Sequence, residues 1–259
     1  MTDLVLKSAP AQGVVHLQMN RPQAYNALSR PLMSALIDEL EIIRKDPSVA
    51  VVVISGAGKG FCAGHDLKEV KAIDNEAERR ALFELCSTLM LAIRNLPIPV
   101  IAQAHGIATA AGCQLVASCD LAVSTLETRF ATPGVNIGLF CSTPMVALSR
   151  NVNPKRAMEM LLTGDFISSD EALEFGLINR AVEASELESC VLEMAAKIAS
   201  KSRKVVKIGK TAFYEQLEMP IEKAYAYTAG VMTGNLGEQD AQEGIGAFIG
   251  KRHPEWSHE

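Results

Sequence analysis

The segment VAVVVISGAGKGFCAGHDL, residues 49–67, decides the fold class of this 259-residue chain. Its first six residues form a continuous apolar run, which is typical of a strand buried on both faces of a parallel sheet. The glycines that follow allow a tight turn directly after this strand. Because α/β proteins bind ligands at the carboxyl ends of their strands, the segment predicts a ligand-binding loop in an α/β fold.

Neighbouring segments extend this pattern in both directions. Residues 14–19, 99–102 and 121–123 are short β-rich or apolar runs that we interpret as further strands. Each has a helical pattern nearby, and Ser29 followed by Pro31 is typical of a helix start. Alternation of strands and helices predicts an α/β protein with much parallel sheet.

The second half of the chain has a different character. Ser168 and Glu171 form a capping-box pattern, and residues 185–248 are almost entirely helical in pattern, with breaks near Ser202, Pro220 and Asn235. We therefore predict an α/β core over residues 1–200, which carries the ligand site, and a helical region over residues 201–259. A tail of about 60 residues is too small for an independent core, so we expect it to pack on the core or on a neighbouring subunit.

Composition excludes several classes of protein. The chain has 25 Lys+Arg against 30 Asp+Glu and only 5% aromatic residues, which argues against nucleic acid as a partner. The six cysteines are irregularly spaced and show no metal-ligand pattern, so we expect reduced thiols and no bound metal.

No apolar run reaches the ~20 residues needed to span a bilayer. The N-terminal residues also lack the features of a signal or transit peptide. These observations predict a cytoplasmic protein without a membrane segment.

A second candidate loop covers residues 104–115, where small residues crowd the passage from a strand into a helix. Free N–H groups at a helix start favour negative charge, and small side chains let a ligand oxygen approach the main chain. Close helix–sheet packing explains the small residues equally well.

In the first loop, the spacing of Gly58, Gly60 and Ala63 is only a weak match to a dinucleotide-binding fingerprint, because the strand before it does not begin a βαβ unit.

Ordered motifs connect the two loops with the rest of the chain. They are Asn20-Arg21-Pro22, Asn26-Ala27-Leu28, residues 61–67, His105-Gly106 through Gly112-Cys113, Cys119-Asp120, Phe130, Pro133, Leu162-Thr163-Gly164 and residues 243–252. Taken together, they resemble the crotonase (enoyl-CoA hydratase/isomerase) superfamily over essentially the whole chain. The resemblance implies a crotonase-type spiral of β-β-α units with a C-terminal helical trimerisation region. It also implies assembly as a homotrimer or a dimer of trimers.

The resemblance further implies an acyl-CoA substrate and a lyase of fatty acid metabolism. The thioester carbonyl would accept hydrogen bonds from the backbone N–H groups of His65 and Ala111, an oxyanion hole that holds the enolate charge. Losing one such donor typically costs ~10²–10³ in rate. The substrate-binding residues implied are Ala63, His65, Asp66, Leu67, Ala111 and Gly112. No separate cofactor is expected, because coenzyme A is part of the substrate.

Two positions depart from the family pattern. The two glutamates that the hydratases use as general base and proton donor fall on Gln114 and Gly134. Without these carboxylates, ordinary hydration of an enoyl-CoA has no general acid or base. Restoring both glutamates is expected to raise crotonyl-CoA hydration. Acyl-CoA decarboxylase-like activity and non-catalytic acyl-CoA binding are the alternative functions, because neither needs the missing pair.

Three further features of the sequence each allow two functional interpretations. The His65 ring either transfers protons or only shapes the pocket. Cys141 and Ser142 are either nucleophiles or polar lining, with no adjacent base in the sequence. The basic stretch over residues 197–210 either binds phosphates, of RNA or of coenzyme A, or forms a solvated face near the junction.

Overall fold

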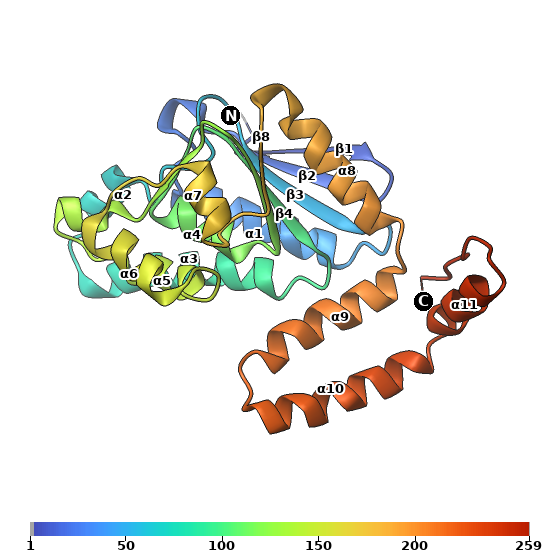
Figure 1. Cartoon of the computed structure of the whole chain (residues 1–259). Helices are drawn as coiled ribbons and strands as arrows, with labels where there is room; N and C mark the ends of the chain where they lie inside the picture. Colours follow the sequence, from blue (N-terminus) through green and yellow to red (C-terminus); the bar gives the residue numbers. More distant parts are fainter. Residues whose placement is uncertain (1–2, 259) are drawn as a thin grey trace.

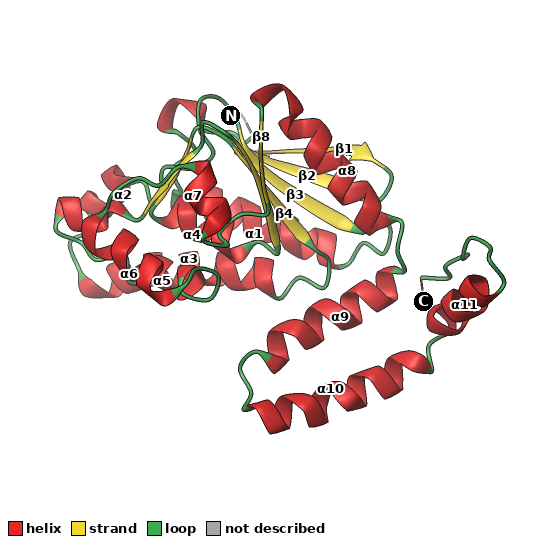
Figure 2. Ribbon diagram, viewed as in Figure 1, coloured by secondary structure: helices red, strands yellow, loops and turns green. Residues whose placement is uncertain are grey.

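The computed structural model describes residues 3–258, and its centre is a mainly parallel β-sheet between helices (Figures 1 and 2). The large sheet has the strand order β1-β2-β3-β4-β6-β8, in which β1 is antiparallel to β2 and the other pairs are parallel. A small sheet pairs β5 with β7 in parallel. The strands are β1 Val5–Ala11, β2 Val14–Met19, β3 Val51–Gly56, β4 Val100–Ala104, β5 Ile107–Thr109, β6 Leu121–Thr125, β7 Arg129–Ala131 and β8 Arg180–Val182.

Three pairs of consecutive strands are each followed by a helix or a 3₁₀ turn. Helix α1 follows β1 and β2, α4 follows β4 and β5, and the 3₁₀ turn η2 follows β6 and β7. The α-helices are α1 Arg30–Arg44, α2 Leu67–Ala72, α3 Glu76–Arg94, α4 Ala111–Ser118, α5 Pro144–Leu148, α6 Pro154–Thr163, α7 Ser169–Glu174, α8 Leu187–Ala199, α9 Arg203–Gln216, α10 Ile221–Leu236 and α11 Gln239–Ile249. The 3₁₀ turns are η1 Pro22–Ala24, η2 Pro133–Ile137 and η3 Ala184–Glu186. The predicted α/β class with parallel sheet is confirmed.

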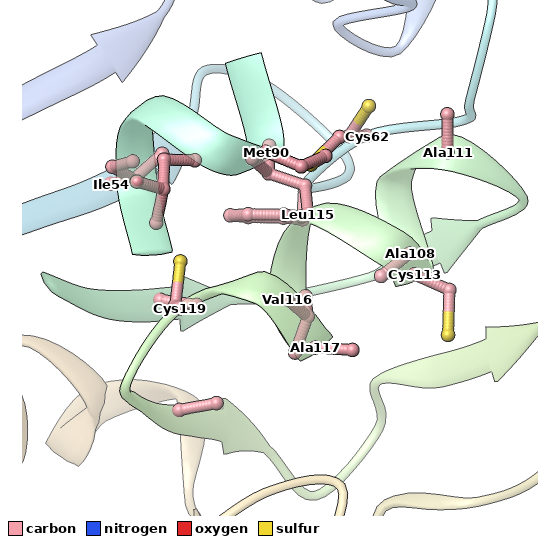
Figure 3. Close-up of a cluster of buried hydrophobic side chains, with 14 of the residues drawn as sticks. Ile54, Cys62, Met90, Ala108, Ala111, Cys113, Leu115, Val116, Ala117 and Cys119 are labelled. Atoms are coloured by element: carbon pink, nitrogen blue, oxygen red, sulfur yellow. The ribbon is translucent and has the colours of Figure 1, made fainter. Parts of the chain in front are cut away.

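Both faces of the large sheet are covered at its central strands, which is why β3 is mostly apolar. Helices α1, α3 and α4 contribute to the main core on one face. Figure 3 shows part of this core, with Ile54, Met90 and Leu115 among its side chains. On the other face, α8 packs its apolar stripe against residues such as Val53 and Ile101. Every residue of β3 is buried, as the apolar run at 49–54 predicts.

Local capping signals in the sequence are also confirmed. The Ser29 side chain accepts the Leu32 N–H and caps α1, with Pro31 in the first turn. Ser168 and Glu171 form the reciprocal capping box of α7. The unpredicted strands are β1, which is largely exposed, and the three-residue strands β5, β7 and β8. Strands that short carry too few residues for a period-2 pattern.

The last three helices project from the body of the molecule (Figure 1). The turn between α8 and α9 lies at Ser200–Ser202, where the sequence places its boundary. Whether residues 201–259 act as a separate oligomerisation region stays a prediction. No helix among residues 3–258 is long and apolar enough to cross a membrane.

A buried ion pair fastens α9 to the body. Lys210 Nζ donates to Asp120 Oδ2 at 2.7 Å, and also to the backbone carbonyls of Ile93 and Ile98. Asp120 also accepts the Tyr214 hydroxyl at 2.9 Å and the Val100 N–H at 2.7 Å. Only 7% of the Lys210 side chain is exposed. The interpretation of residues 197–210 as a solvated face is therefore wrong for Lys210, because its charge is paired in the interior.

Candidate functional site

Three segments far apart in the sequence converge at the start of α4. The loop over residues 62–66 runs beside β5, with Thr109 N–H donating to the Cys62 carbonyl at 3.0 Å. A Cβ atom placed on Gly64 would lie 3.3 Å from the Ala111 nitrogen, so the two loops touch. The segment after β7 joins them through the Ala110 N–H, which donates to the Ala131 carbonyl at 2.9 Å. The two loops predicted from the sequence are therefore in contact and together form one candidate site.

Glycines make this close approach possible. Gly64 has φ +97°, and a Cβ there would meet Ala110 Cβ at 2.9 Å. A Cβ on Gly112 would lie 2.1 Å from the Cys62 carbonyl oxygen, which no side chain tolerates. The small residues at the start of α4 therefore serve close packing, and that same packing brings the Ala111 N–H to the loop of residues 62–66.

Ala110 holds a strained conformation at the centre of the site. Its φ of 49° and ψ of −117° lie in a region that L-residues rarely adopt. Strained backbone of this kind persists only where the surrounding structure enforces it, and it clusters at functional sites. Here the Ala110 N–H bond to Ala131 and the Ala110 carbonyl bond from the Gln114 N–H fix the peptide that leads into Ala111.

The N–H groups of His65 and Ala111 are the predicted oxyanion donors. Among residues 3–258, neither N–H donates a hydrogen bond to another group of the protein. The neighbours of His65 are fixed, because Leu28 N–H donates to the Gly64 carbonyl at 2.7 Å and Asp66 N–H donates to the Leu28 carbonyl at 3.2 Å. Ala111 is the first residue of α4, so its N–H also lies at the positive end of the helix.

The His65 ring packs edge-on against Phe83 of α3, with the ring centroids 5.4 Å apart. Both ring nitrogens are buried, and neither has a hydrogen-bond partner in the part of the chain that the structure describes. Burial lowers the pKa of this imidazole, and the nearby Leu28 backbone opposes that effect only in part. The ring therefore lies against Phe83, and its two nitrogens are without a hydrogen-bond partner among residues 3–258.

Asp66 holds the loop in place through an ion pair and a helix cap. Its carboxylate accepts from Arg21 Nη2 at 2.8 Å and caps α2 through the Lys68 N–H. Arg21 also donates to the Ala27 carbonyl, so this ion pair ties residues 21–27 to the oxyanion loop. The hydrogen bond from Arg21 is the main cause that lowers the pKa of Asp66.

Substituting Asp66 by asparagine tests this tie. A carboxyl whose pKa is lowered in the folded state stabilises the fold above its unfolded pKa of about 3.9, and the stabilisation is lost as the pH falls through the folded pKa. We expect Asp66→Asn to keep the helix cap but to lose about 1 kcal/mol at pH 7. Urea unfolding between about pH 6 and pH 2 should show a shallower loss of stability in the variant. Parallel curves for the two proteins would contradict this role, and Asp170→Asn, an exposed acid on α7, is the control.

The remaining predicted substrate residues lie around the same loop. Ala63 is half-buried, and its carbonyl accepts the Thr109 hydroxyl at 3.0 Å. Leu67 is 55% exposed at the start of α2. Gly112 lies in the first turn of α4 against the Cys62 carbonyl. The geometry therefore places all six residues on the two contacting segments, while their roles toward a substrate stay predictions.

Gln114 and Gly134 are the positions onto which the resemblance would place the two glutamates of the hydratases. Gln114 is buried on α4, and its side-chain oxygen lies 3.9 Å from the Cys86 sulfur. Gly134 is buried in η2, and a Cβ there would lie 2.6 Å from the Leu139 carbonyl oxygen and 2.9 Å from Cys141 Sγ. The expectation that two glutamates could be restored needs correction at Gly134, because backbone already fills the space for a side chain.

Cys141 and Ser142 gain no base from the fold. Burial raises the pKa of the Cys141 thiol, which keeps it protonated at neutral pH. The exposed Ser142 hydroxyl donates only to the Phe140 carbonyl. Among the described residues, neither has a hydrogen-bonded histidine or carboxylate, so this geometry supports the interpretation of both as polar lining rather than nucleophiles.

Two contributors to the site, Arg21 and Thr132, are not predicted as site residues from the sequence. Arg21 stands in a recognised motif, but its partner Asp66 is 45 residues away. Thr132 is fully buried before Gly134, and its hydroxyl has no partner within residues 3–258. Within that range, no group of three His, Cys, Asp or Glu side chains is arranged to hold a metal ion.

Comparison with known proteins defines the class first. The crystal structure of an enoyl-CoA hydratase from Mycobacterium smegmatis superposes with a TM-score of 0.96 at 52% identity, covering 98% of this chain and 99% of that one. Human enoyl-CoA hydratase domain-containing protein 3 gives 0.95 at 44% identity, covering 98% and 100%. The fold is therefore the crotonase fold. The sequence profile of the enoyl-CoA hydratase/isomerase family matches residues 10–259, and the chain belongs to that family.

Curated relatives agree with this assignment. Mouse enoyl-CoA hydratase domain-containing protein 3, mitochondrial, is 47% identical over 95% of this chain and 82% of its own length. A crotonyl-CoA hydratase from Syntrophomonas wolfei is 33% identical over 91% of both chains. The mouse, rat, human and frog forms of domain-containing protein 3 are all named as mitochondrial. These names contradict the prediction of a cytoplasmic location, which rested on the absence of targeting features near the N-terminus.

Proposed function

We propose that this protein is an acyl-CoA lyase that binds the thioester carbonyl between the His65 and Ala111 N–H groups. Removing a proton or a carboxylate next to a thioester, or adding to its conjugated double bond, puts negative charge on the carbonyl oxygen. Two fixed donors beside the positive end of a helix stabilise that charge without reorganising. The observation that carries the proposal is the contact between the loops, which brings these two unpartnered N–H groups together.

Binding of a matched ligand pair tests the carbonyl site without altering the protein. Butyryl-CoA has the carbonyl, whereas the S-butyl thioether of coenzyme A has a methylene in its place. Two hydrogen bonds of about 1 kcal/mol each predict that the thioester binds at least about tenfold more tightly in calorimetry. Equal dissociation constants for the two ligands would overturn the proposal.

Proline at position 111 would remove one donor, but it is a poor probe here. A residue before proline is pushed toward extended conformations, whereas Ala110 has φ 49°. A loss of binding in Ala111→Pro would therefore mix the missing N–H with a distorted Ala110. The ligand pair separates these effects because the protein stays unchanged.

Decarboxylation of an acyl-CoA is the second candidate reaction. The packing at Gly134 favours it, because the Leu139 carbonyl leaves no room for a carboxylate there. Loss of carbon dioxide generates the enolate directly and needs no base to remove a proton. Binding of acyl-CoA without turnover is the remaining alternative. A protein of that kind would also bind butyryl-CoA more tightly than the thioether, because the carbonyl site is the same.

We also propose that the chain assembles as a homotrimer or as a dimer of trimers. The projecting helices α9–α11 expose large apolar side chains, which is unusual on a monomer surface. These side chains are Phe213, Leu217, Ile221, Tyr225, Met232, Leu236, Ile245, Phe248 and Ile249. A second copy of the chain would cover them.

A further inference from the structure

Asn26 is a fully buried polar residue beside the turn that follows β3. The three side-chain hydrogen bonds that the structure shows for it all go to the main chain. Its amide nitrogen donates to the carbonyls of Ala57 and Gly60, each at 2.9 Å, and its oxygen accepts the Arg21 N–H at 2.9 Å. One side chain therefore closes its own loop and fastens that loop to the turn after β3.

The conformation and the partners of position 26 together favour asparagine. Its φ of 54° lies in the left-handed region, which asparagine, aspartate and glycine tolerate better than other residues. The two carbonyls need a donor, which an ionised aspartate cannot supply and glycine does not have. The end of β3 also leaves room for the amide, because a Cβ atom on Gly56 would lie 2.6 Å from Asn26 Nδ2.

The loop that Asn26 holds continues into Leu28, which bonds to the main chain on both sides of His65. Leu28 N–H donates to the Gly64 carbonyl at 2.7 Å, and the Leu28 carbonyl accepts the Asp66 N–H at 3.2 Å. The Gly64 carbonyl and the His65 N–H belong to one planar trans peptide, so they point in opposite directions. The bond from Leu28 therefore fixes the direction of the His65 N–H, which it turns away from Leu28.

We propose that Asn26 is a positioning residue for the thioester site, which acts through Leu28 on the direction of the His65 N–H. Without the amide, the loop before Leu28 loses its attachment to the turn after β3, and the peptide between Gly64 and His65 can tilt. Hydrogen bonds weaken steeply when their angle becomes poor, so a tilted donor contributes little to a bound carbonyl. This inference rests on the proposed thioester site and adds the residue that orients one of its two donors.

Two substitutions of Asn26 test this role with the same pair of ligands. Asn26→Asp keeps the size of the side chain and the acceptor for the Arg21 N–H, but it places a carboxylate against two carbonyls. Asn26→Gly keeps the left-handed backbone and removes all three bonds. In both variants, calorimetry should show that the preference for butyryl-CoA over its S-butyl thioether falls by about fivefold, the contribution of one hydrogen bond. The affinity for the thioether should change by less than about twofold, because it has no carbonyl to contact.

The infrared band of the bound thioester carbonyl reports the donors directly. Hydrogen bonds to a carbonyl lower its stretching frequency, so the band of isotope-labelled butyryl-CoA should lie lower in the natural protein than in water. Both Asn26 variants should move the band part of the way back. A purely structural role would lower the melting temperature without moving this band.

Asn75→Asp is the matched control, because Asn75 is an exposed cap of α3 and aspartate can still accept the Glu78 N–H. It should leave the ligand preference and the infrared band unchanged. Hydrogen exchange followed by mass spectrometry covers a variant that is less stable. Exchange over residues 61–67 should rise selectively in the Asn26 variants, whereas a general loss of stability would raise it along the whole chain.

The outcomes separate this inference from the proposed function. A thioester preference that survives unchanged in the Asn26 variants would overturn the positioning role and leave the carbonyl site standing. An unmoved infrared band, with exchange raised equally along the chain, would overturn it as well. Equal affinity of the natural protein for the thioester and the thioether would overturn the proposed function itself, and the inference with it.

Discussion

The unmodified protein is expected to hydrate crotonyl-CoA at least about 10⁴-fold more slowly than a hydratase with two catalytic glutamates. A general acid and a general base each contribute roughly 10²–10⁴-fold, and neither Gln114 nor Gly134 can supply or accept a proton. Gln114→Glu should raise the hydration rate by about 10²-fold, because position 114 already holds a side chain of the same size. Absorbance of the enoyl thioester measures the rate.

Gly134→Glu should not add to this gain. Its Cβ would lie 2.6 Å from the Leu139 carbonyl oxygen, so the turn over residues 134–139 must open before any carboxylate fits. Misplacement by about 1 Å costs around 10²-fold in rate, and the strain also lowers stability. Gly134→Ala introduces the same contact without a charge and should lower the melting temperature as well.

Controls distinguish the carboxylate from a packing effect. Gln114→Met has a similar size and no charge, and it should leave hydration at the natural level. Efficient hydration by the unmodified protein would contradict the argument, because catalysis would then come from residues other than positions 114 and 134. A double variant that is faster than Gln114→Glu alone would show that the Leu139 turn yields easily.

Substituting Asp120 by alanine is expected to cost about 3–5 kcal/mol of unfolding free energy. Removing one partner of a buried ion pair leaves the other charge uncompensated, and Lys210 is nearly inaccessible to water. The Tyr214 hydroxyl and the Val100 N–H would lose their acceptor at the same time. Urea unfolding measures the loss, and light scattering should show a smaller fraction of trimer because α9 is no longer fastened to the body.

A second substitution separates the charge from the packing. Asp120→Ala combined with Lys210→Met removes both charges and should recover a substantial part of the stability, because no buried charge remains unpaired. Arg156→Met, at a cation of an exposed pair with Glu159, should change stability by less than about 1 kcal/mol. A cost below about 1 kcal/mol for Asp120→Ala would contradict the anchoring role. A stable natural monomer at micromolar concentration would contradict the proposed trimer.

Much of the fold was predictable because its signals are local. The buried strand at residues 49–54, the cap at Ser29 and the capping box at Ser168 depend on neighbours within a few positions, and the structure confirms them. The two candidate loops were also predictable, since strand ends and small residues mark them. Family membership followed from many ordered motifs, whereas the cytoplasmic location rested on missing signals and was wrong.

What the sequence determined by itself is the class of fold, the family and the two loops of the candidate site. Tertiary structure alone decided which distant groups meet: Arg21 with Asp66, Lys210 with Asp120, and the Leu139 carbonyl with the space beside Gly134. The partners in the two ion pairs are 45 and 90 residues apart. Periodicity and capping reach only one or two turns along the chain, whereas these contacts depend on how whole elements pack. The unpartnered His65 ring belongs to the same category, because only the packed structure shows that nothing within the described chain satisfies it.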